Sequence, residues 1–348
     1  MRIEQLTFTR FIAAIAIVVF HYGGKLPYLS EGLLGTIFKQ ANVGVSYFYI
    51  LSGFVMVVAM QKYQHLSLFS FLQNRLARMY PVYLLALLLV FWLKTPIQFN
   101  FITIFNNVIM LQAWWPAQAL SYNYPGWSIS VEWFFYLLFP FLFNYVYKKY
   151  SFRQVAFYVI AWWLLTQVFY LWFLYNQKPL GIYTVKDAYY YPLLHLNAFL
   201  LGNLGGLFYV QKQASAQKKQ FIVPVFLLLF LLVLLLHIPF KYPAYHNGLM
   251  CVVFLPLVYF LASGSNAINQ FFSKKPFVYL GELSFGIYIY QYPVWLACSK
   301  FAFFGGRQAF YQSSLPIFGL QLAILVLVAI ISYEFIENPL RKLLRYKK

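Results

Sequence analysis

An arginine and a histidine lie eleven residues apart in the first apolar stretch of the chain, RFIAAIAIVVFH. In an α-helix, about 100° per residue brings Arg10 and His21 back to nearly the same face, about 16 Å apart along the axis. A neutral imidazole can take a proton from a hydroxyl. A lone histidine on an apolar helix is otherwise a core residue. Because ionisable groups are costly in such a helix, the shared face instead favours general-base chemistry at His21.

One acid lies well inside an apolar stretch, Glu132 in GWSISVEWFFYLLFPF. A buried carboxyl group needs a partner or a proton. We expect Glu132 at about the depth of His21, where it could orient the imidazole or stabilise its charged form. The alternative is a structural acid that bonds the backbone or a tyrosine.

Two further arginines, Arg75 and Arg78 in NRLARMYPVY, come just before another apolar stretch. Residues three apart share one face of a helix. With Arg10 they would form a three-arginine patch suited to phosphate groups. Alone, they would be ordinary basic anchors at a membrane surface.

Weaker candidates for a substrate pocket are Ser52 in GVSYFYILSGF, Trp127, and Tyr288 and Gln291 in LGELSFGIYIYQYP. Helix packing explains these positions as well, because small residues allow close approach of helices. The sequence has no HExxH, Walker loop, GxGxxG or Cys/His spacing. It therefore predicts no metal site and no tightly bound cofactor.

The elements that position these residues follow from composition. The 348 residues are 62% hydrophobic and only 9% charged, against about 25% charged in a soluble domain. Lipid must cover so much apolar surface, so we expect an all-α polytopic transmembrane bundle, one domain over residues 1–348. The net charge of +19 fits loops facing anionic lipid and excludes a nucleic-acid-binding class, since no basic stretch outside the apolar runs is interleaved with aromatics. Cys251 and Cys298 lie in apolar runs and predict packing residues.

Apolar runs of spanning length occur ten times, at 6–22, 43–60, 80–95, 127–146, 154–174, 190–210, 221–238, 247–262, 283–303 and 316–336. With the N-terminus inside, Lys and Arg fall more than twice as often on the cytoplasmic segments as on the outer ones. The positive-inside rule therefore predicts both termini in the cytoplasm. The uncharged segment 95–126 is interrupted by Asn106 and Asn107 and predicts an interfacial or re-entrant helix on the outer face.

Taken together, these blocks resemble the membrane acyltransferase-3 family. RFIAAIAIVVFH resembles the Arg and His pair on the first helix of that family. The later blocks follow in the family's order: GVSYFYILSGF, RLARMYP, WSISVEWFFY, LGELSFGIYIYQYP and FIENPLRK. They run from Arg10 to Lys342, which is nearly the whole chain.

The resemblance implies that His21 is the catalytic histidine, with Arg10 as its helix partner. It implies that Arg75 and Arg78 help to bind an acyl-CoA donor and that Glu132 is the acid of the Trp-Ser block. Gln291 stands where a histidine is common in the family, and a glutamine cannot act as a base. With ten spans, we expect the chain to lack the extra helix and the soluble esterase-like domain that some members append.

The expected reaction is O-acyl transfer to a hydroxyl of a cell-surface or lipid-linked carbohydrate, in a multi-pass protein of a bacterial inner (plasma) membrane. The donor would be acyl-CoA, above all acetyl-CoA, with its phosphates on the cytoplasmic arginines and its arm reaching toward His21. Membrane lipid and glycan-assembly proteins are further expected partners. Direct transfer and an acyl-histidine intermediate both remain open. The main alternative is a transporter or flippase for acyl or glycan groups, because intramembrane polar residues also mark transport paths.

Overall fold

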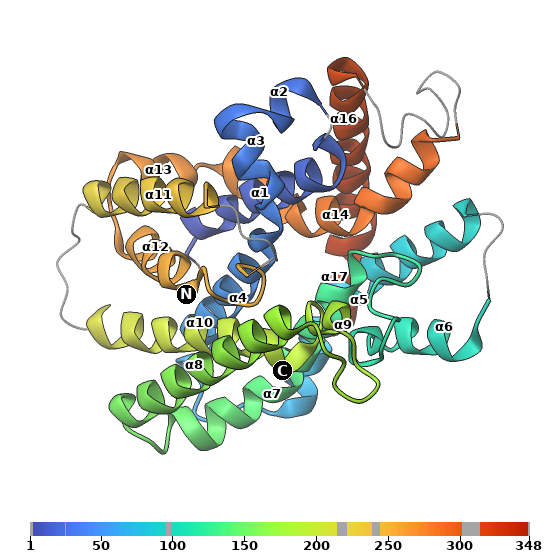
Figure 1. Cartoon of the computed structure of the whole chain (residues 1–348). Helices are drawn as coiled ribbons and strands as arrows, with labels where there is room; N and C mark the ends of the chain where they lie inside the picture. Colours follow the sequence, from blue (N-terminus) through green and yellow to red (C-terminus); the bar gives the residue numbers. More distant parts are fainter. Residues whose placement is uncertain are drawn as a thin grey trace. The chain divides into compact units, whose positions relative to one another are not determined.

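A computed structural model describes residues 3–24, 26–94, 99–213, 221–238, 244–300 and 314–346. The regular structure of these residues is helical, apart from one isolated bridge between Leu180 and Tyr183. Figure 1 shows this succession of helices along the chain. The predicted all-α fold class is confirmed for the part of the chain that is described.

Seven helical stretches of the described residues are long and apolar enough to cross a membrane. They are Gln5–Gly23, Ala41–Met60, Leu68–Leu93, Gly126–Tyr147, Phe152–Asn176, Val185–Lys212 and Leu315–Leu344. In order, they contain α1 (Gln5–Val18), α4 (Gly44–Met60), α5 (Leu68–Leu93), α7 (Gly126–Phe141), α8 (Phe152–Asn176), α9 (Val185–Ala188) with α10 (Pro192–Gln213), and α16 (Leu315–Ser332) with α17 (Asn338–Leu344).

Two shorter apolar helices, α11 (Ile222–Leu236) and α12 (Cys251–Ser263), and the longer α14 (Lys275–Cys298) fall in the other three predicted ranges. Each of the ten predicted ranges therefore contains a helix. The last part of the range 283–303 lies outside the described residues. The other α-helices among the described residues are short: α2 (Pro27–Ser30), α3 (Gly32–Lys39), α6 (Phe101–Val108) and α13 (Ala267–Phe272). Seven membrane-crossing helices are thus supported by length and composition, and a count of ten spans stays a prediction.

By their contacts, the residues divide into two compact units. The first unit comprises Met1–Ala13, Val43–Leu68 and Phe134–Gly281, and the second comprises Ala14–Asn42, Phe69–Trp133 and Glu282–Lys348. All of α4 and of α8 to α13, together with the start of α1 and the later part of α7, therefore belong to the first unit. Most of α5, the segment before α7, most of α14, and α16 and α17 belong to the second.

The first unit is built on close packing of α4 against α10. A Cβ at Gly53 would lie 2.3 Å from the carbonyl oxygen of Phe199, and one at Gly202 would lie 2.1 Å from that of Ile50. Only glycine permits backbones to approach so closely. The small residues of GVSYFYILSGF thus serve helix packing, as the packing interpretation predicted. Both cysteines are buried and form no disulfide.

The segment before α12 is held inside the first unit by side chains of three helices. Ser46 of α4 donates to the carbonyl oxygen of His246 at 2.8 Å. Gln167 of α8 and Asn197 of α10 both donate to the carbonyl oxygen of Asn247, at 2.6 and 3.0 Å. Polar side chains therefore donate hydrogen bonds to backbone carbonyl oxygens of a segment that lies outside the helices.

In the second unit, buried amides fix the predicted interfacial segment. Tyr83 of α5 donates to the carbonyl oxygen of Asn107 at 2.7 Å, and Gln112 donates to the Tyr83 hydroxyl and to the carbonyl oxygen of Gly126. Asn107 in turn donates to the Ser121 hydroxyl at 2.7 Å. The segment contains the helix α6, as predicted, and Phe101 of α6 is 82% exposed. The position of α6 at a membrane surface stays a prediction.

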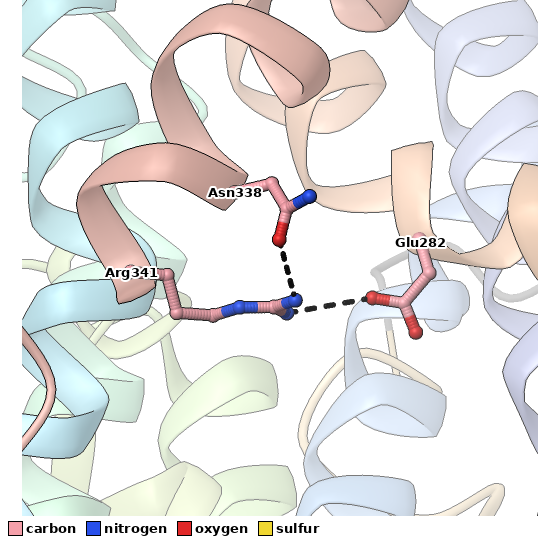
Figure 2. A network of polar contacts seen from close by, with 3 residues as sticks. All are labelled: Glu282, Asn338 and Arg341. Atoms are coloured by element: carbon pink, nitrogen blue, oxygen red, sulfur yellow. Dashed lines mark hydrogen bonds and ion pairs between the residues drawn. The ribbon is translucent and has the colours of Figure 1, made fainter. Parts of the chain in front are cut away.

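Two helices in the C-terminal segment of the second unit, α14 and α17, are joined by an ion pair. Figure 2 shows Arg341 of α17 with its two partners, Asn338 of the same helix and Glu282 of α14. Its guanidinium group donates to Asn338 Oδ1 at 3.1 Å and lies 3.7 Å from Glu282 Oε2. The hydroxyls of Tyr290 of α14 and Ser332 of α16 lie 2.8 Å apart. These contacts hold α14 against α16 and α17.

Candidate active site

His21 lies in a break of the regular helix. The α-helix α1 ends at Val18, and Val19–Gly23 form a π-helical turn that contains the histidine. A π-turn has more residues per turn than an α-helix and is frequent at functional sites. The α-helical repeat that would place Arg10 and His21 on one face therefore does not continue to His21. The imidazole is half-buried, so it is both held by neighbours and open to other groups.

Gln291 of α14 holds the imidazole from one side. Gln291 Oε1 lies 2.6 Å from His21 Nδ1, and Gln291 Nε2 donates to the carbonyl oxygen of Tyr288 at 2.6 Å. The Gln291 side chain is fully buried. The contact with His21 joins residues 270 positions apart in the sequence, both within the second unit.

Aromatic side chains surround the other sides of His21. The rings of His21 and Tyr124 have centroids 5.0 Å apart and lie edge to face. The Tyr124 hydroxyl donates to the Tyr22 hydroxyl at 2.7 Å, and the Tyr22 ring stacks on Trp295 at 4.2 Å. The ring centroids of Tyr292 and Tyr124 are 5.0 Å apart. His21 thus borders a cluster of aromatic rings, called here the aromatic wall, in which it contacts Tyr22 and Tyr124, and these contact Trp295 and Tyr292.

Tyr124 comes from a strained connection between α6 and α7. Three residues there have positive φ although they carry side chains: Met110, Ala117 and Tyr122, at 58°, 60° and 54°. Such conformations cost free energy and persist only where the surroundings enforce them. Asn123, next to Tyr124, donates to the carbonyl oxygen of Ile289 in α14 at 3.2 Å. The connection is therefore tied to the same helix that carries Gln291.

The predicted arginines lie on two helices. Arg10 is half-buried on α1, in the first unit. Arg75 and Arg78 are half-buried in the second unit, and they lie within the continuous helix α5 rather than before it. Arg75 lies 5.1 Å above the ring of Phe71. A patch of all three arginines stays a prediction.

The residues just before Arg75 bind the C-terminal part of the chain. Gln73 donates to the carbonyl oxygen of Leu344 at 3.0 Å, and Asn74 accepts a hydrogen bond from the backbone of Tyr346 at 3.1 Å. Residues that flank the blocks RLARMYP and FIENPLRK are therefore joined within the second unit, and the ion pair of Glu282 with Arg341 links FIENPLRK to LGELSFGIYIYQYP.

The remaining candidates fall on three helices. Glu132 is half-buried on α7, and Trp127 at the start of α7 is buried. Tyr288 is buried on α14, where its carbonyl oxygen fixes the Gln291 amide. Ser52 is half-buried on α4. Of these candidates, Gln291 is the one with a direct hydrogen bond to His21 among the contacts described, and the pairing of Glu132 with His21 stays a prediction.

The residues that sequence reasoning missed are those of the aromatic wall. Tyr22 follows His21 directly, and Tyr124 comes three residues before Trp127. Aromatic residues are so frequent in this chain, at 23%, that these positions carried no distinct signal. Their role depends on contacts between segments far apart in the sequence.

The described residues contain no group of three or more His, Cys, Asp or Glu side chains that could hold a metal ion. What the arrangement offers is one imidazole with a fixed hydrogen-bond partner on one nitrogen. Such a group can accept a proton or attack a carbonyl carbon through its other nitrogen.

Comparison with known proteins decides the family. The acyltransferase domain that defines the acyltransferase-3 family matches residues 3–334. This chain belongs to the acyltransferase-3 family. The resemblance seen in its sequence blocks is confirmed, and the matched range includes residues of both compact units of this acyltransferase.

Several curated relatives of this acyltransferase-3 chain are bacterial. It is 23% identical over 367 residues to O-acetyltransferase OatA of Staphylococcus aureus, which covers 96% of this chain and 56% of the relative. It is 24% identical over 363 residues to peptidoglycan O-acetyltransferase OatA of Listeria monocytogenes, with 96% and 55% covered. Acyltransferase MdmB of Streptomyces mycarofaciens is 28% identical over 176 residues, with 47% and 43% covered.

This acyltransferase-3 chain therefore spans about half the length of the curated relatives it matches. No solved structure gives a significant match. Its long apolar helices and its family indicate a multi-pass membrane protein of the acyltransferase-3 family.

Proposed function

We propose that this acyltransferase moves a short acyl group, above all acetyl, from acyl-CoA to a hydroxyl of a cell-surface or lipid-linked carbohydrate. The observation that carries the proposal is the placement of His21: half-buried in a π-helical turn, bonded through Nδ1 and surrounded by aromatic rings. The family supplies the reaction type. The names of the relatives, which include O-acetyltransferases, favour acetyl and an oxygen acceptor.

In the direct form of the reaction, His21 acts as a general base. Its free nitrogen takes the proton of the acceptor hydroxyl while the oxygen attacks the thioester carbonyl carbon. The C–S bond then breaks, and the departing CoA sulfur takes the proton back from the imidazole. In the other form, the same nitrogen attacks the thioester carbonyl carbon, the C–S bond breaks, and CoA leaves as the thiolate. The acceptor oxygen then attacks the acyl carbon, the bond from that carbon to nitrogen breaks, and the hydroxyl proton passes to the CoA thiolate. Both forms use the same nitrogen.

The other candidate residues take supporting roles in the proposal. Arg10, Arg75 and Arg78 bind the phosphate groups of CoA from the cytoplasmic side, because guanidinium groups form bidentate bonds to phosphate. Glu132 stabilises the charged imidazole. Ser52, Trp127 and Tyr288 contribute to the substrate pocket. Both termini are cytoplasmic, and the acceptor enters from the outer side past residues 95–126.

The test compares membranes that contain wild type, His21→Ala and His237→Ala at equal levels, each given labelled acetyl-CoA and the surface glycan of the host. His237 is a matched control because it is an exposed histidine at the end of α11. We expect label in the glycan with wild type and His237→Ala, and a loss of about 100-fold or more with His21→Ala. Equal labelling by all three would overturn the role of His21 and favour a transporter of acyl or glycan groups.

Labelled succinyl-CoA, given in parallel, separates the acyl groups. Transfer of succinyl at a higher rate than acetyl would keep the reaction class and replace the proposed donor. Transfer of neither group to any host glycan would contradict the proposed acceptor class.

A further inference from the structure

Gln291 is fixed in one orientation by its own hydrogen bonds. Its Nε2 donates to the carbonyl oxygen of Tyr288 at 2.6 Å, and a flipped amide would place two oxygens at that distance. The orientation of the amide is therefore set by Tyr288 and not by His21. The atom that faces His21 is Oε1, which can only accept a hydrogen bond.

This orientation determines where the proton of His21 lies. Because Gln291 Oε1 is 2.6 Å from His21 Nδ1 and has no proton to give, Nδ1 must donate. A neutral imidazole carries one N–H, so Nε2 is left with its lone pair. The side chain of Gln291 is fully buried and belongs to a continuous helix, so the arrangement exists before any substrate binds.

We infer that Gln291 is a positioning residue that holds His21 in the Nδ1-protonated tautomer and makes Nε2 the one reactive nitrogen. The inference rests on the proposed function and identifies the atom that performs it. A carboxylate at this position would also stabilise the charged imidazole. A glutamine fixes the tautomer without adding a charge or a titrating group.

The titratable side chains that contact His21 leave this assignment intact. They are Tyr22 and Tyr124, whose rings lie 6.1 and 5.0 Å from the imidazole. Their hydroxyls are 2.7 Å apart, with that of Tyr124 donating to that of Tyr22. Phenols are neutral near pH 7, so these rings add no charge beside His21.

The first test reads the tautomer directly by solid-state NMR of ¹⁵N-histidine-labelled protein in lipid bilayers. The chain has five histidines, and the difference between wild type and His21→Ala isolates the signals of His21. We expect a protonated Nδ1 and an unprotonated Nε2 in wild type, and a changed distribution in Gln291→Met. A protonated Nε2 in wild type, or the same signals in wild type and Gln291→Met, would overturn the inference.

The second test measures transfer kinetics. Methionine matches glutamine in length but cannot accept the Nδ1–H bond, so Gln291→Met should lower kcat about 100-fold and leave the KM for acetyl-CoA unchanged. Gln291→Glu keeps an oxygen acceptor and adds a negative charge beside the imidazole. Its acid limb of activity should therefore move upward by about one pH unit or more. An unchanged kcat in Gln291→Met, or an unmoved acid limb in Gln291→Glu, would contradict the inference.

Gln321 provides a matched control. It is a fully buried glutamine on α16 in the same unit, and its amide has no hydrogen-bond partner among the described residues. Gln321→Met should change neither the histidine signals nor the pH profile. If wild type shows the expected tautomer but transfers no acyl group, the proposed reaction fails while the assignment of the proton stands.

Discussion

The Tyr124 hydroxyl donates a hydrogen bond to the Tyr22 hydroxyl at 2.7 Å. The Tyr124 ring also meets the His21 ring edge to face, with the two centroids 5.0 Å apart. One residue from a strained connection thus contacts both the histidine and its chain neighbour. Burial raises the pKa of the Tyr124 phenol, so the hydroxyl stays protonated and remains a donor at neutral pH. We expect the hydrogen bond between the two hydroxyls to affect stability and the ring contact with His21 to affect the rate of transfer.

Two substitutions of Tyr124 separate the ring from the hydroxyl. Tyr124→Phe keeps the ring against His21 and loses the bond to Tyr22, so it should cost about 1 kcal/mol of stability and change kcat by less than about threefold. Tyr124→Leu loses the ring contact as well, and its kcat should fall about tenfold or more. The measurements are the thermal midpoint in detergent and the rate of acyl transfer.

Tyr158→Leu is the control, because that tyrosine is 68% exposed on α8. If Tyr124→Leu transfers acyl groups as fast as Tyr158→Leu, the aromatic wall has no part in the reaction.

Substitution of Arg75 or Arg78 should weaken donor binding rather than chemistry. If these guanidinium groups bind the CoA phosphates, Arg75→Ala and Arg78→Ala should each raise the KM for acyl-CoA about tenfold. The value of kcat should change little. Higher salt should raise the KM of wild type more than that of either variant. Arg153→Ala, at an exposed arginine of α8, provides the control. An unchanged KM in both α5 variants would remove them from the donor site.

The ion pair of Figure 2 should contribute to stability and not to catalysis. Arg341 and Glu282 are 31% and 12% exposed and lie 3.7 Å apart, so solvent screens the pair in part. A double-mutant cycle of Arg341→Met and Glu282→Gln should give a coupling energy of about 1 kcal/mol, with kcat near that of wild type. The thermal midpoints of the four proteins measure it. A coupling indistinguishable from zero would mean that α17 is held to α14 by its other contacts.

His246 should make the stability of the first unit depend on pH. Burial lowers the pKa of His246 to about 4, from the usual 6.5. The titratable groups that face it are His195, with ring centroids 5.4 Å apart, and Tyr189 and Tyr190, at 6.2 and 6.1 Å. The unfolded chain binds a proton below about pH 6.5 whereas folded His246 stays neutral, so the free energy of unfolding falls as the pH is lowered from 6.5 to 4. The loss from this residue should be about 3 kcal/mol at pH 4.

The control for this effect is the exposed His65. The thermal midpoint of wild type and of His65→Gln should fall steeply between pH 6.5 and 4, and that of His246→Gln should fall less. Identical pH profiles of the His246 and His65 variants would contradict the assignment.

Local sequence patterns predicted the helices and pointed to a candidate residue within one of them. Hydropathy alone located a helix in each of the ten ranges, because an apolar run of this length has few other stable forms in lipid. Polarity within an apolar run singled out His21. The same patterns could not show the π-helical turn at Val19–Gly23, because it departs from the 3.6-residue repeat on which the prediction was based.

The partners of His21 could not be predicted from local patterns. Gln291 is 270 residues away from His21, and its sequence context predicts only a weak candidate for the substrate pocket. The position of Tyr124 depends on a connection in which three residues with side chains adopt positive φ, a conformation that such residues disfavour. Contacts of this kind are set by the packing of whole helices, and periodicity within one helix carries no information about them. The resemblance of several blocks to one family was more informative, and the structure joins two of those blocks directly through Glu282 and Arg341.

The most direct test of the central claim is chemical rescue of His21→Ala by free imidazole, in protein reconstituted with labelled acetyl-CoA and the acceptor glycan. If the His21 imidazole performs the proton or acyl transfer, the variant should lose about 100-fold or more in rate. Added imidazole should restore part of that rate in a saturable manner and leave wild type unchanged. Wild-type rates in His21→Ala without imidazole would contradict the claim.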